Sequence, residues 1–270
     1  MDEKVIVNKK DYTYLNWSHV RSSSGTTGTF LKAEETIDGR KRYYKLSLFD
    51  SEKGIIGHEC VNEIIVDRLL TILGVEHLEY KLIHGDVDID GKAYDTWFCV
   101  STDFKEKGES KSALDDYYQI QAEDGISRYD FCMENGWGKY IDTMLAVDFL
   151  ILNRDRHGAN IEILRDSKKR TLRIAPFFDH GLSLLYSCLS EAEIKDFDVM
   201  KDIPCHNFIG SRSTLENLAL IKDKKKVFDK QLVKADKKKL FADLDGVITK
   251  AHMDKIWDMI YSRWCYYESL

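Results

Sequence analysis

The stretch LILNRDRHGANIEIL, residues 150–164, is apolar at both ends and strongly polar in the middle. The polar part places Asp155, His157 and Asn160 around one glycine, Gly158. A segment that only crosses a hydrophobic core has no use for these three groups, because burying polar side chains without partners is costly. Gly158 also interrupts helices. We therefore expect an irregular loop whose polar side chains have a chemical task.

A strand hairpin is expected directly after this loop. Residues 161–164 (IEIL) and 171–177 (TLRIAPF) are predicted strands because of their branched and aromatic side chains, and a polar DSKKR turn lies between them. Antiparallel pairing would place Asn160, before the first strand, beside Asp179, after the second. We therefore predict that Asp155, Asn160 and Asp179 converge at one end of the hairpin.

Three oxygen-bearing side chains at one place are the set that phosphoryl transfer requires. One carboxylate, here Asp155, receives or orients the acceptor hydroxyl, while Asn160 and Asp179 hold Mg²⁺ against a triphosphate. Mg²⁺ prefers such hard oxygen ligands and keeps waters and phosphate oxygens in its other positions. The set contains no Cys/His cluster, which argues against zinc.

The composition is that of an ordinary soluble globular protein. The chain has 270 residues, of which 43% are hydrophobic and 32% charged. This length favours one large domain, or two lobes that share a cleft. The formal net charge of −6 argues against a general nucleic-acid coat, so we expect no direct nucleic-acid partner.

The cysteines and the apolar runs bear on the compartment. Six cysteines are scattered without a C-x-x-C pair, which favours reduced thiols in a cytosol-like compartment over a disulfide frame or a zinc site. The amino-terminal MDEKVIVNKKDY lacks an apolar signal segment, and no apolar run is long enough to span a bilayer. We therefore expect a cytoplasmic protein without a membrane span, and leave its export to a host open.

The first hundred residues are predicted to form strands around one helix. Asp38-Gly39 and Asp90-Gly91 each stand between strand-like arms, and Asp-Gly is a strong signal for a tight hairpin turn. Between the two hairpins, residues 58–75 carry apolar side chains at helical spacing, and Gly74 fits a helix stop. The predicted order is hairpin, helix, hairpin.

The rest of the chain is predicted to be mostly helical. Residues 105–112 (KEKGESKS) are polar and predict a loop. Helical patterns follow in residues 141–152, 214–223 and 251–270.

Residues 223–241 are rich in lysine but also hold acids and spaced apolar residues. We interpret this segment as a solvated helical face rather than as a phosphate-binding patch. The predicted fold class is α+β with two lobes. A small antiparallel-sheet lobe is expected over residues 1–104, and a larger helical lobe over residues 105–270.

The spacing D-x-x-x-x-N, followed by D-x-G, resembles the catalytic and metal-binding loops of the protein-kinase superfamily. The form DRHxxN, with a histidine two residues after the aspartate, resembles phosphatidylinositol kinases and the HipA-like serine/threonine kinases of bacteria. NRDRHGANIEIL together with FFDHG is most similar to the HipA-like group, in particular its short CtkA-type members. The resemblance covers most of the chain and is strongest in this block.

This resemblance implies a kinase-like fold that uses ATP and Mg. Asp155 resembles the catalytic aspartate, and Asn160 and Asp179 resemble the two metal ligands. His157 resembles the histidine near the phosphates, although a histidine that only braces the loop explains it equally well. His180 stands where D-F-G has phenylalanine, which keeps the metal role of Asp179 but argues against eukaryotic-style flipping of this segment.

Lys45 lies within the apolar strand RYYKLSLF, where alternation puts it on the same face as Tyr43 and Ser47. A lysine on the inner face of a sheet has to be paired or meet a phosphate, whereas one on the solvated face needs no explanation. The resemblance implies contact with the nucleotide phosphates and pairing with a helix glutamate. Glu63 fits that glutamate better and Glu59 is the substitute, although either can be a plain surface charge.

RSSSGTTGTF, residues 21–30, consists largely of small residues that let backbone N–H groups approach phosphates. It is neither a Walker A sequence nor a full G-x-G-x-x-G, so by itself it is equally a flexible loop. Its place ahead of Lys45 in the order of the family implies a phosphate loop at Ser23, Ser24, Gly25 and Thr26. By the same resemblance, an adenine base docks on hinge backbone groups near Thr102 and Phe104.

The expected activity is ATP- and Mg-dependent transfer of a phosphoryl group to a serine or threonine of a protein substrate. Ser22, Ser23 and Ser24 lie beside the expected phosphate site, so the protein itself is a second acceptor, and a phosphate there should repel ATP. A phosphatidylinositol-type lipid kinase uses the same motif. A catalytically silent nucleotide-binding module that regulates a partner is the alternative from another class. A nucleic-acid binder that uses the lysine-rich segment fits the acidic balance poorly.

Overall fold

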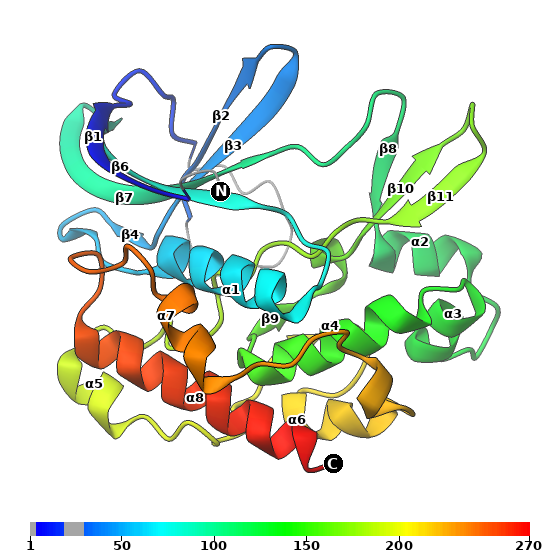
Figure 1. The fold of residues 1–270 in the computed structure, drawn as a ribbon. Helices are drawn as coiled ribbons and strands as arrows, with labels where there is room; N and C mark the ends of the chain where they lie inside the picture. The colour runs from blue at the N-terminus through cyan, green and yellow to red at the C-terminus, as the bar shows by residue number, and fades with distance from the viewer. Residues whose placement is uncertain (1–3, 19–29) are drawn as a thin grey trace.

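The computed structural model describes residues 4–18 and 30–270 as a mixed α+β protein. A five-stranded sheet in the order β1-β6-β7-β3-β2 lies at the upper left of Figure 1, and most helices lie below it. The strands of this sheet are β1 (Val5–Asp11), β2 (Lys32–Ile37), β3 (Arg40–Leu46), β6 (Tyr80–Ile89) and β7 (Lys92–Thr102). The short pair β4 (Phe49–Asp50) and β5 (Gly54–Ile55) follows β3.

Both hairpins predicted from Asp-Gly are confirmed. β2 pairs with β3 around Asp38 and Gly39, and β6 pairs with β7 around Asp90 and Gly91. All four turn residues have positive φ, between 50° and 82°, which is the geometry of a tight turn that joins twisted strands.

One edge of the sheet differs from the prediction. β1 runs parallel to β6, with Val5 paired to Leu82, so the expectation of an antiparallel sheet is wrong here and confirmed for the other three strand pairs. Turn signals identify strands that follow each other directly, whereas four strands and a helix separate β1 from β6 in the chain. The direction of such a distant pairing leaves no trace in the local pattern.

Helix α1 (Glu59–Leu73) lies directly beneath the sheet, where it contacts β6 and β7, and it also packs against α7 (Figure 1). Because it is covered on several sides, its apolar residues do not form one narrow stripe; Ile64, Ile65, Leu69 and Leu70 are all fully buried. Gly74 ends the helix in the left-handed region, at φ 75°, and its N–H reaches the carbonyls of the last turn.

A second, three-stranded sheet in the order β11-β10-β8 carries the predicted hairpin after the polar loop. Ile163 of β10 pairs with Ile174 of β11, which confirms the hairpin. The predicted loop over residues 105–112 is wrong at its end, because β8 adds to the free edge of β10. A tertiary pairing of this kind overrides a polar local sequence. The elements are β8 (Ser110–Ala113), α2 (Leu114–Gln121), α3 (Arg128–Glu134), α4 (Gly138–Leu150), β10 (Glu162–Asp166) and β11 (Thr171–Ile174).

The carboxyl-terminal part is less regular than predicted. The helices expected over residues 141–152 and 251–270 are present as α4 and α8, but the helix expected over residues 214–223 is reduced to the four-residue α6 and a 3₁₀ turn. The elements here are α5 (Glu191–Asp196), β12 (His206–Asn207), α6 (Thr214–Asn217), α7 (Lys237–Leu240) and α8 (Lys250–Glu268). None of the described helices combines the length and the apolar character needed to cross a membrane.

The lysine-rich segment, residues 223–241, is mostly irregular, so the interpretation as a helical face is wrong. It contains only two 3₁₀ turns and the single turn of α7. Val227, Leu232 and Leu240 anchor it in the core, each less than 5% exposed. Their spacing of five and eight residues does not fit one helix face, so the backbone follows its anchors instead.

Candidate functional site

The buried guanidinium of Arg156 organises the loop after α4. Its Nη2 lies 2.9 Å from Oδ1 of Asp148 on α4, and its Nη1 donates to the carbonyls of Asn160 at 3.3 Å and Phe178 at 3.2 Å. One side chain, 1% exposed, therefore joins a helix, the polar loop and the segment before Asp179. The predicted convergence of the polar loop with this segment has a direct physical cause.

Asp155 lies in β9 (Asp155–Arg156), which pairs with β12. The side-chain amide of Asn160 donates to the backbone carbonyl of Asp155 at 2.8 Å, and this hydrogen bond holds the loop closed. Two imidazoles flank the carboxylate: His157 Nε2 at 3.7 Å and His206 Nδ1 at 3.8 Å. Burial raises the pKa of Asp155; the two histidines lower it and the negative charge of Asp179 raises it further, with a net upward shift.

Asp179 is held in a left-handed backbone conformation with φ 58°, which is uncommon for a residue with a side chain. Its N–H donates to the hydroxyl of Tyr80 at 3.2 Å, and its Oδ1 lies 2.5 Å from Nζ of Lys45. Burial alone would raise the pKa of Asp179, but the charge of Lys45 outweighs it and holds that pKa well below its usual range. Asp179 is therefore ionised at neutral pH.

Lys45 is shared between two carboxylates. Its Nζ lies 3.1 Å from Oε1 of Glu63 in addition to its contact with Asp179, and Glu63 also accepts the N–H of His180 at 2.9 Å. Of the two glutamates considered from the sequence, Glu63 contacts the lysine, while Glu59 accepts the N–H of Leu48 at 3.0 Å. A buried cation with two anionic neighbours keeps its charge, so the pKa of Lys45 lies above its ordinary value despite burial.

The glycine of the Asp-His-Gly segment lies where little space is left for a side chain. A Cβ on Gly181 would lie 3.1 Å from Cβ of Glu59, 3.3 Å from Oε1 of Glu63 and 3.3 Å from Nζ of Lys45. These contacts are tighter than ordinary van der Waals packing. A side chain at this position would therefore force Glu59, Glu63 or Lys45 to shift by a few tenths of an ångström.

A cavity of about 410 Å³ opens beside this cluster. It is lined by Lys45, Asp179, Tyr80 and Phe104, among others. The additional lining residues are Lys32, Glu34, Lys41, Tyr43, Tyr44, Leu78, Cys99, Ser101, Lys111, Glu162 and Phe178. Aromatic walls with several cations at one place suit a flat base that carries phosphates.

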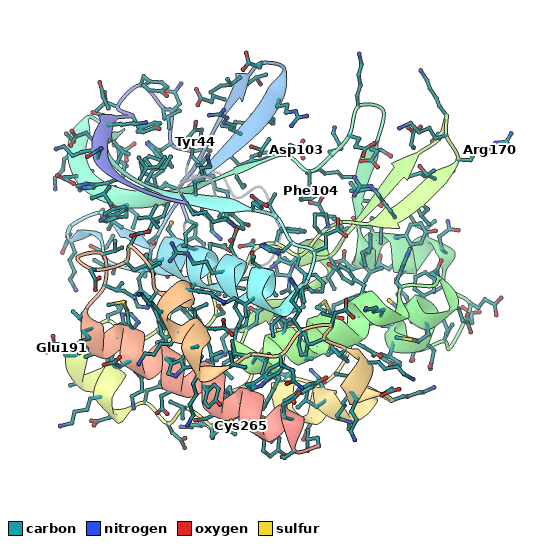
Figure 2. All side chains as sticks on the ribbon, viewed as in Figure 1. Tyr44, Asp103, Phe104, Arg170, Glu191 and Cys265 are labelled. Atoms are coloured by element: carbon teal, nitrogen blue, oxygen red, sulfur yellow. The ribbon has the colours of Figure 1, made fainter. Side chains whose placement is uncertain are left out.

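The two predicted hinge residues are placed differently. Phe104 lines the cavity, and its carbonyl accepts from Arg173 Nη2 at 3.2 Å. Thr102 does not line this cavity; it pairs with Arg42 at the end of β7 and borders a separate pocket of about 340 Å³. Figure 2 labels Asp103 and Phe104 between the five-stranded sheet and the β10–β11 hairpin.

The donor atoms suit a hard cation with few protein ligands. Within residues 4–18 and 30–270 there is no group of three or more His, Cys, Asp or Glu side chains that could hold a metal by itself. Asn160 directs its amide nitrogen to the Asp155 carbonyl, which leaves its oxygen available, and Asp179 uses only one carboxylate oxygen for Lys45. One amide and one carboxylate oxygen, completed by water and phosphate oxygens, is the Mg²⁺ pattern.

The remaining predicted residues have clear positions. His157 has a buried Nε2 without a hydrogen-bond partner among the described residues, so bracing of the loop through this atom is not seen. His180 is 2% exposed, and burial lowers its pKa far below the ordinary value. Ser23, Ser24, Gly25 and Thr26 lie outside the described residues.

Several side chains of the site were missed by the sequence analysis. Asp148 and Arg156 carried a signal, since a carboxylate inside the apolar run LAVDFLIL requires a buried partner. His206, Lys111 and Glu162 carried none. They reach the site only through the pairing of β12 with β9 and of β8 with β10.

The arrangement of strands and helices is that of a HipA-like kinase fold. The chain is similar to the crystal structure of the Helicobacter pylori proinflammatory kinase CtkA, with 15% identity, a TM-score of 0.56 and 94% of each chain covered.

It is also similar to HipA of Shewanella oneidensis MR-1, solved as a toxin–antitoxin complex with HipB and operator DNA. The identity is 11% and the TM-score 0.44, over 91% of this chain and 64% of that chain. No protein-family model and no curated protein matches the sequence.

Replacing Arg156 by methionine should destabilise the protein by about 3–5 kcal/mol, because Asp148 would be left buried without its partner. Replacing Asp148 by leucine in addition should recover part of this loss. Urea unfolding followed by circular dichroism measures both. Arg165→Met is the matched control, since Arg165 is exposed and should change stability by less than about 0.5 kcal/mol. A loss for Arg156→Met as small as that of the control would contradict the role given to this guanidinium.

Proposed function

We propose that this protein is an ATP- and Mg-dependent serine/threonine protein kinase of the HipA-like type. The observation that carries the proposal is the sharing of Lys45 Nζ between Glu63 and Asp179 at the wall of a cavity of about 410 Å³. The proposed architecture has two lobes, residues 1–104 and residues 105–270, with the nucleotide between them. The likeness to CtkA supports the fold, and the chemistry rests on the cluster itself.

The nucleotide is proposed to occupy the cavity with its base near Phe104 and its phosphates near Lys45. Lys45 is already desolvated and charged, so it can exchange its contact with Asp179 for phosphate oxygens without changing its protonation state. Ser23, Ser24, Gly25 and Thr26 are proposed to cover the phosphates, and backbone groups near Thr102 and Phe104 to receive the base.

The acceptor hydroxyl is proposed to lose its proton to Asp155 as its oxygen takes the γ-phosphoryl group, leaving ADP. The raised pKa of Asp155 makes it a better proton acceptor than an ordinary aspartate. Asn160 and Asp179 are the proposed Mg²⁺ ligands, and the ion, when bound, neutralises phosphate charge. His157 stays a proposed member of the site through its proximity to Asp155.

The proposed partners are a protein substrate with a serine or threonine acceptor and the protein itself, in the cytoplasm of a bacterium. A lipid kinase would share these residues and differ only in its acceptor. A silent nucleotide-binding module would bind ATP without transferring phosphate.

Replacing Asp155 by alanine should lower phosphoryl transfer by about 10² to 10⁴-fold and leave ATP binding intact, because only the proton acceptor is removed. Replacing Asp179 by alanine should abolish Mg-dependent transfer. Incubation with labelled ATP, using casein in one arm and phosphatidylinositol vesicles in the other, measures both variants. Label in the lipid alone would favour the lipid kinase. ATP binding without any label would favour the silent module, and normal labelling by either variant would refute the assignment.

The rate should fall on the acid side, because Asp155 must be unprotonated to accept a proton. Its pKa is raised, so activity is present above that raised value and is lost as the pH falls through it. His206→Ala removes a positive neighbour that lowers this pKa, so the acid limb should move to higher pH. Initial rates between about pH 4 and pH 8 measure the shift. An acid limb that stays in place would contradict the coupling of the two side chains.

Self-phosphorylation should occur at Ser22, Ser23 or Ser24, since the resemblance puts them beside the γ-phosphate. Mass spectrometry after incubation with ATP and Mg locates the modified residue, with Asp155→Ala as the inactive control. A phosphate there carries about −1.5 to −2 charges and should weaken the binding of the next ATP molecule by repulsion. Unmodified serines in an active enzyme would contradict this prediction.

A further inference from the structure

A second cleft, with a volume of about 570 Å³, opens at Asp155. Lys45 and Asp179, which line the nucleotide cavity, do not line this cleft. Its walls come from regions that are far apart in the chain and converge around Asp155. The lining residues are Phe30, Leu48, Glu59, Arg154, Leu182, Tyr186, Ser187, Leu189, Pro204, Cys205, His206 and Arg212. Asp155 therefore touches a space that is separate from the nucleotide cavity.

Arg154 contributes a positive charge to this cleft. Its backbone N–H donates to the carbonyl of Leu182 at 3.0 Å, and its side-chain Nε donates to the carbonyl of Pro204 at 2.9 Å. Both partners are neutral, and no carboxylate of the described chain forms an ion pair with this guanidinium. The side chain is thus oriented by backbone groups rather than by a carboxylate.

Arg212 contributes a second positive charge from a braced loop. Its carbonyl accepts the N–H of Cys205 at 2.8 Å, and the preceding Ser211 is held by the buried side chain of Asn217 at 2.7 Å and 3.1 Å. A Cβ on Gly210 would lie 2.2 Å from Oδ1 of Asn217, so the loop packs tightly there. In contrast, the Arg212 side chain is exposed and has no partner among residues 4–18 and 30–270.

The negative side chains of the cleft do not neutralise these arginines. Glu59 is 2% exposed, and its Oε2 accepts the backbone N–H of Leu48 at 3.0 Å. Asp155 is the proposed reacting group and lies near the imidazoles of His157 and His206. Within the described residues, neither guanidinium group has a carboxylate partner, so this part of a protein with net charge −6 attracts an anion.

We propose that this cleft receives the acceptor segment and selects a serine or threonine that is flanked by aspartate or glutamate. Arg154 and Arg212 bind the flanking carboxylate, while Leu182, Leu189 and Pro204 offer apolar contact to the rest of the segment. A planar guanidinium suits a carboxylate, because it can donate two parallel hydrogen bonds. This inference rests on the proposed kinase function and adds to it the class of substrate.

The test compares peptides that differ only beside the acceptor serine, with aspartate, asparagine or lysine in the flanking positions. Binding is measured by fluorescence anisotropy with the acceptor replaced by alanine, so that this arm does not require catalysis. Phosphorylation of the serine versions is measured with labelled ATP. The aspartate peptide should bind about tenfold more tightly than the asparagine peptide, as expected for one charge-assisted contact. The lysine peptide should bind most weakly.

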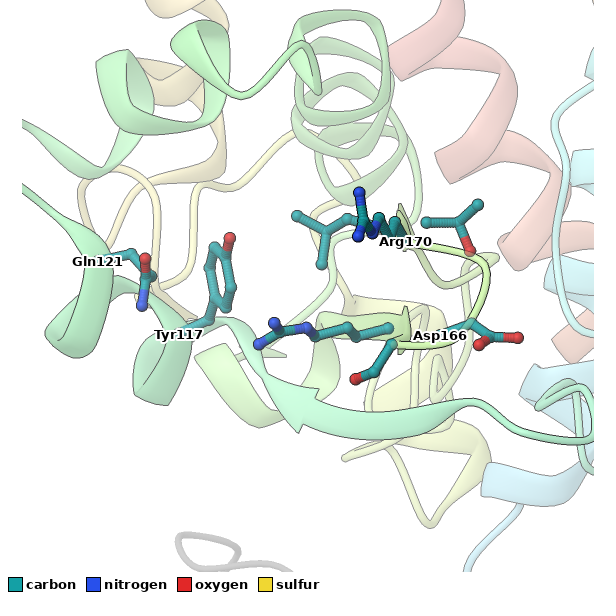
Figure 3. A pocket seen from close by; sticks show the side chains of 8 residues that line it. Tyr117, Gln121, Asp166 and Arg170 are labelled. Atoms are coloured by element: carbon teal, nitrogen blue, oxygen red, sulfur yellow. The ribbon is translucent and has the colours of Figure 1, made fainter.

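Arg212→Ala should reduce the preference for aspartate to less than about threefold, and Arg212→Glu should reverse it in favour of lysine. Arg165→Ala is the matched control: Arg165 is also exposed, and it borders a different pocket, in which Tyr117 and Gln121 of α2 lie opposite Asp166 and Arg170 of the hairpin (Figure 3). This control should keep the full preference.

Equal binding of the three peptides to the unmodified protein would overturn the inference, as would a preference that survives Arg212→Glu. Failure of the kinase proposal looks different: the preference in binding would be present, and depend on Arg212, while no phosphate reached any peptide. The binding arm thus decides the inference, and the labelling arm decides the function on which it rests.

Discussion

The buried contact between Arg156 and Asp148 is the constraint on which the site depends. A guanidinium costs several kcal/mol to bury unless it is paired with a carboxylate and its other donors are satisfied. Here Asp148 accepts from two nitrogens, and the carbonyls of Asn160 and Phe178 accept from the third. Those carbonyls belong to the two segments that carry the predicted oxygen ligands. The hydrogen bonds of the buried Arg156 guanidinium therefore fix the relative position of the groups proposed for catalysis.

Burial and the surrounding charges shift the pKa values of Asp179 and Asp155 in opposite directions. Lys45 pulls the pKa of Asp179 down, while burial and the neighbouring negative charge push the pKa of Asp155 up. Two carboxylates whose pKa values are driven apart are typical of sites in which one group stays ionised and the other handles a proton. Glu63 fixes the cation that produces this difference, and Gly181 provides the space for it. The electrostatics of the site thus depend on α1 as much as on the polar loop.

Local signals predicted the parts of the fold that local interactions build. The two Asp-Gly hairpins need only a turn that accepts positive φ, and the helix over residues 59–73 needs only apolar spacing and a terminal glycine. The predictions that were wrong concern segments whose conformation is set by distant partners. β8 pairs with an edge of β10 that is otherwise free, β1 pairs in parallel with β6, which is distant in the chain, and the lysine-rich segment follows its buried anchors.

The sequence by itself determined the α+β class, both sheet hairpins, the hairpin after the polar loop and the residue types suited to Mg²⁺ and phosphate. These follow from turn chemistry, periodicity and ligand preference, which act over a few residues. Only the tertiary structure decided that Glu63 rather than Glu59 meets Lys45, that Thr102 lies outside the cavity, and that His206 and Arg212 stand near Asp155. Such contacts join residues far apart in the chain, so no local pattern records them. They arise from the need to pair each buried charge and close each sheet edge.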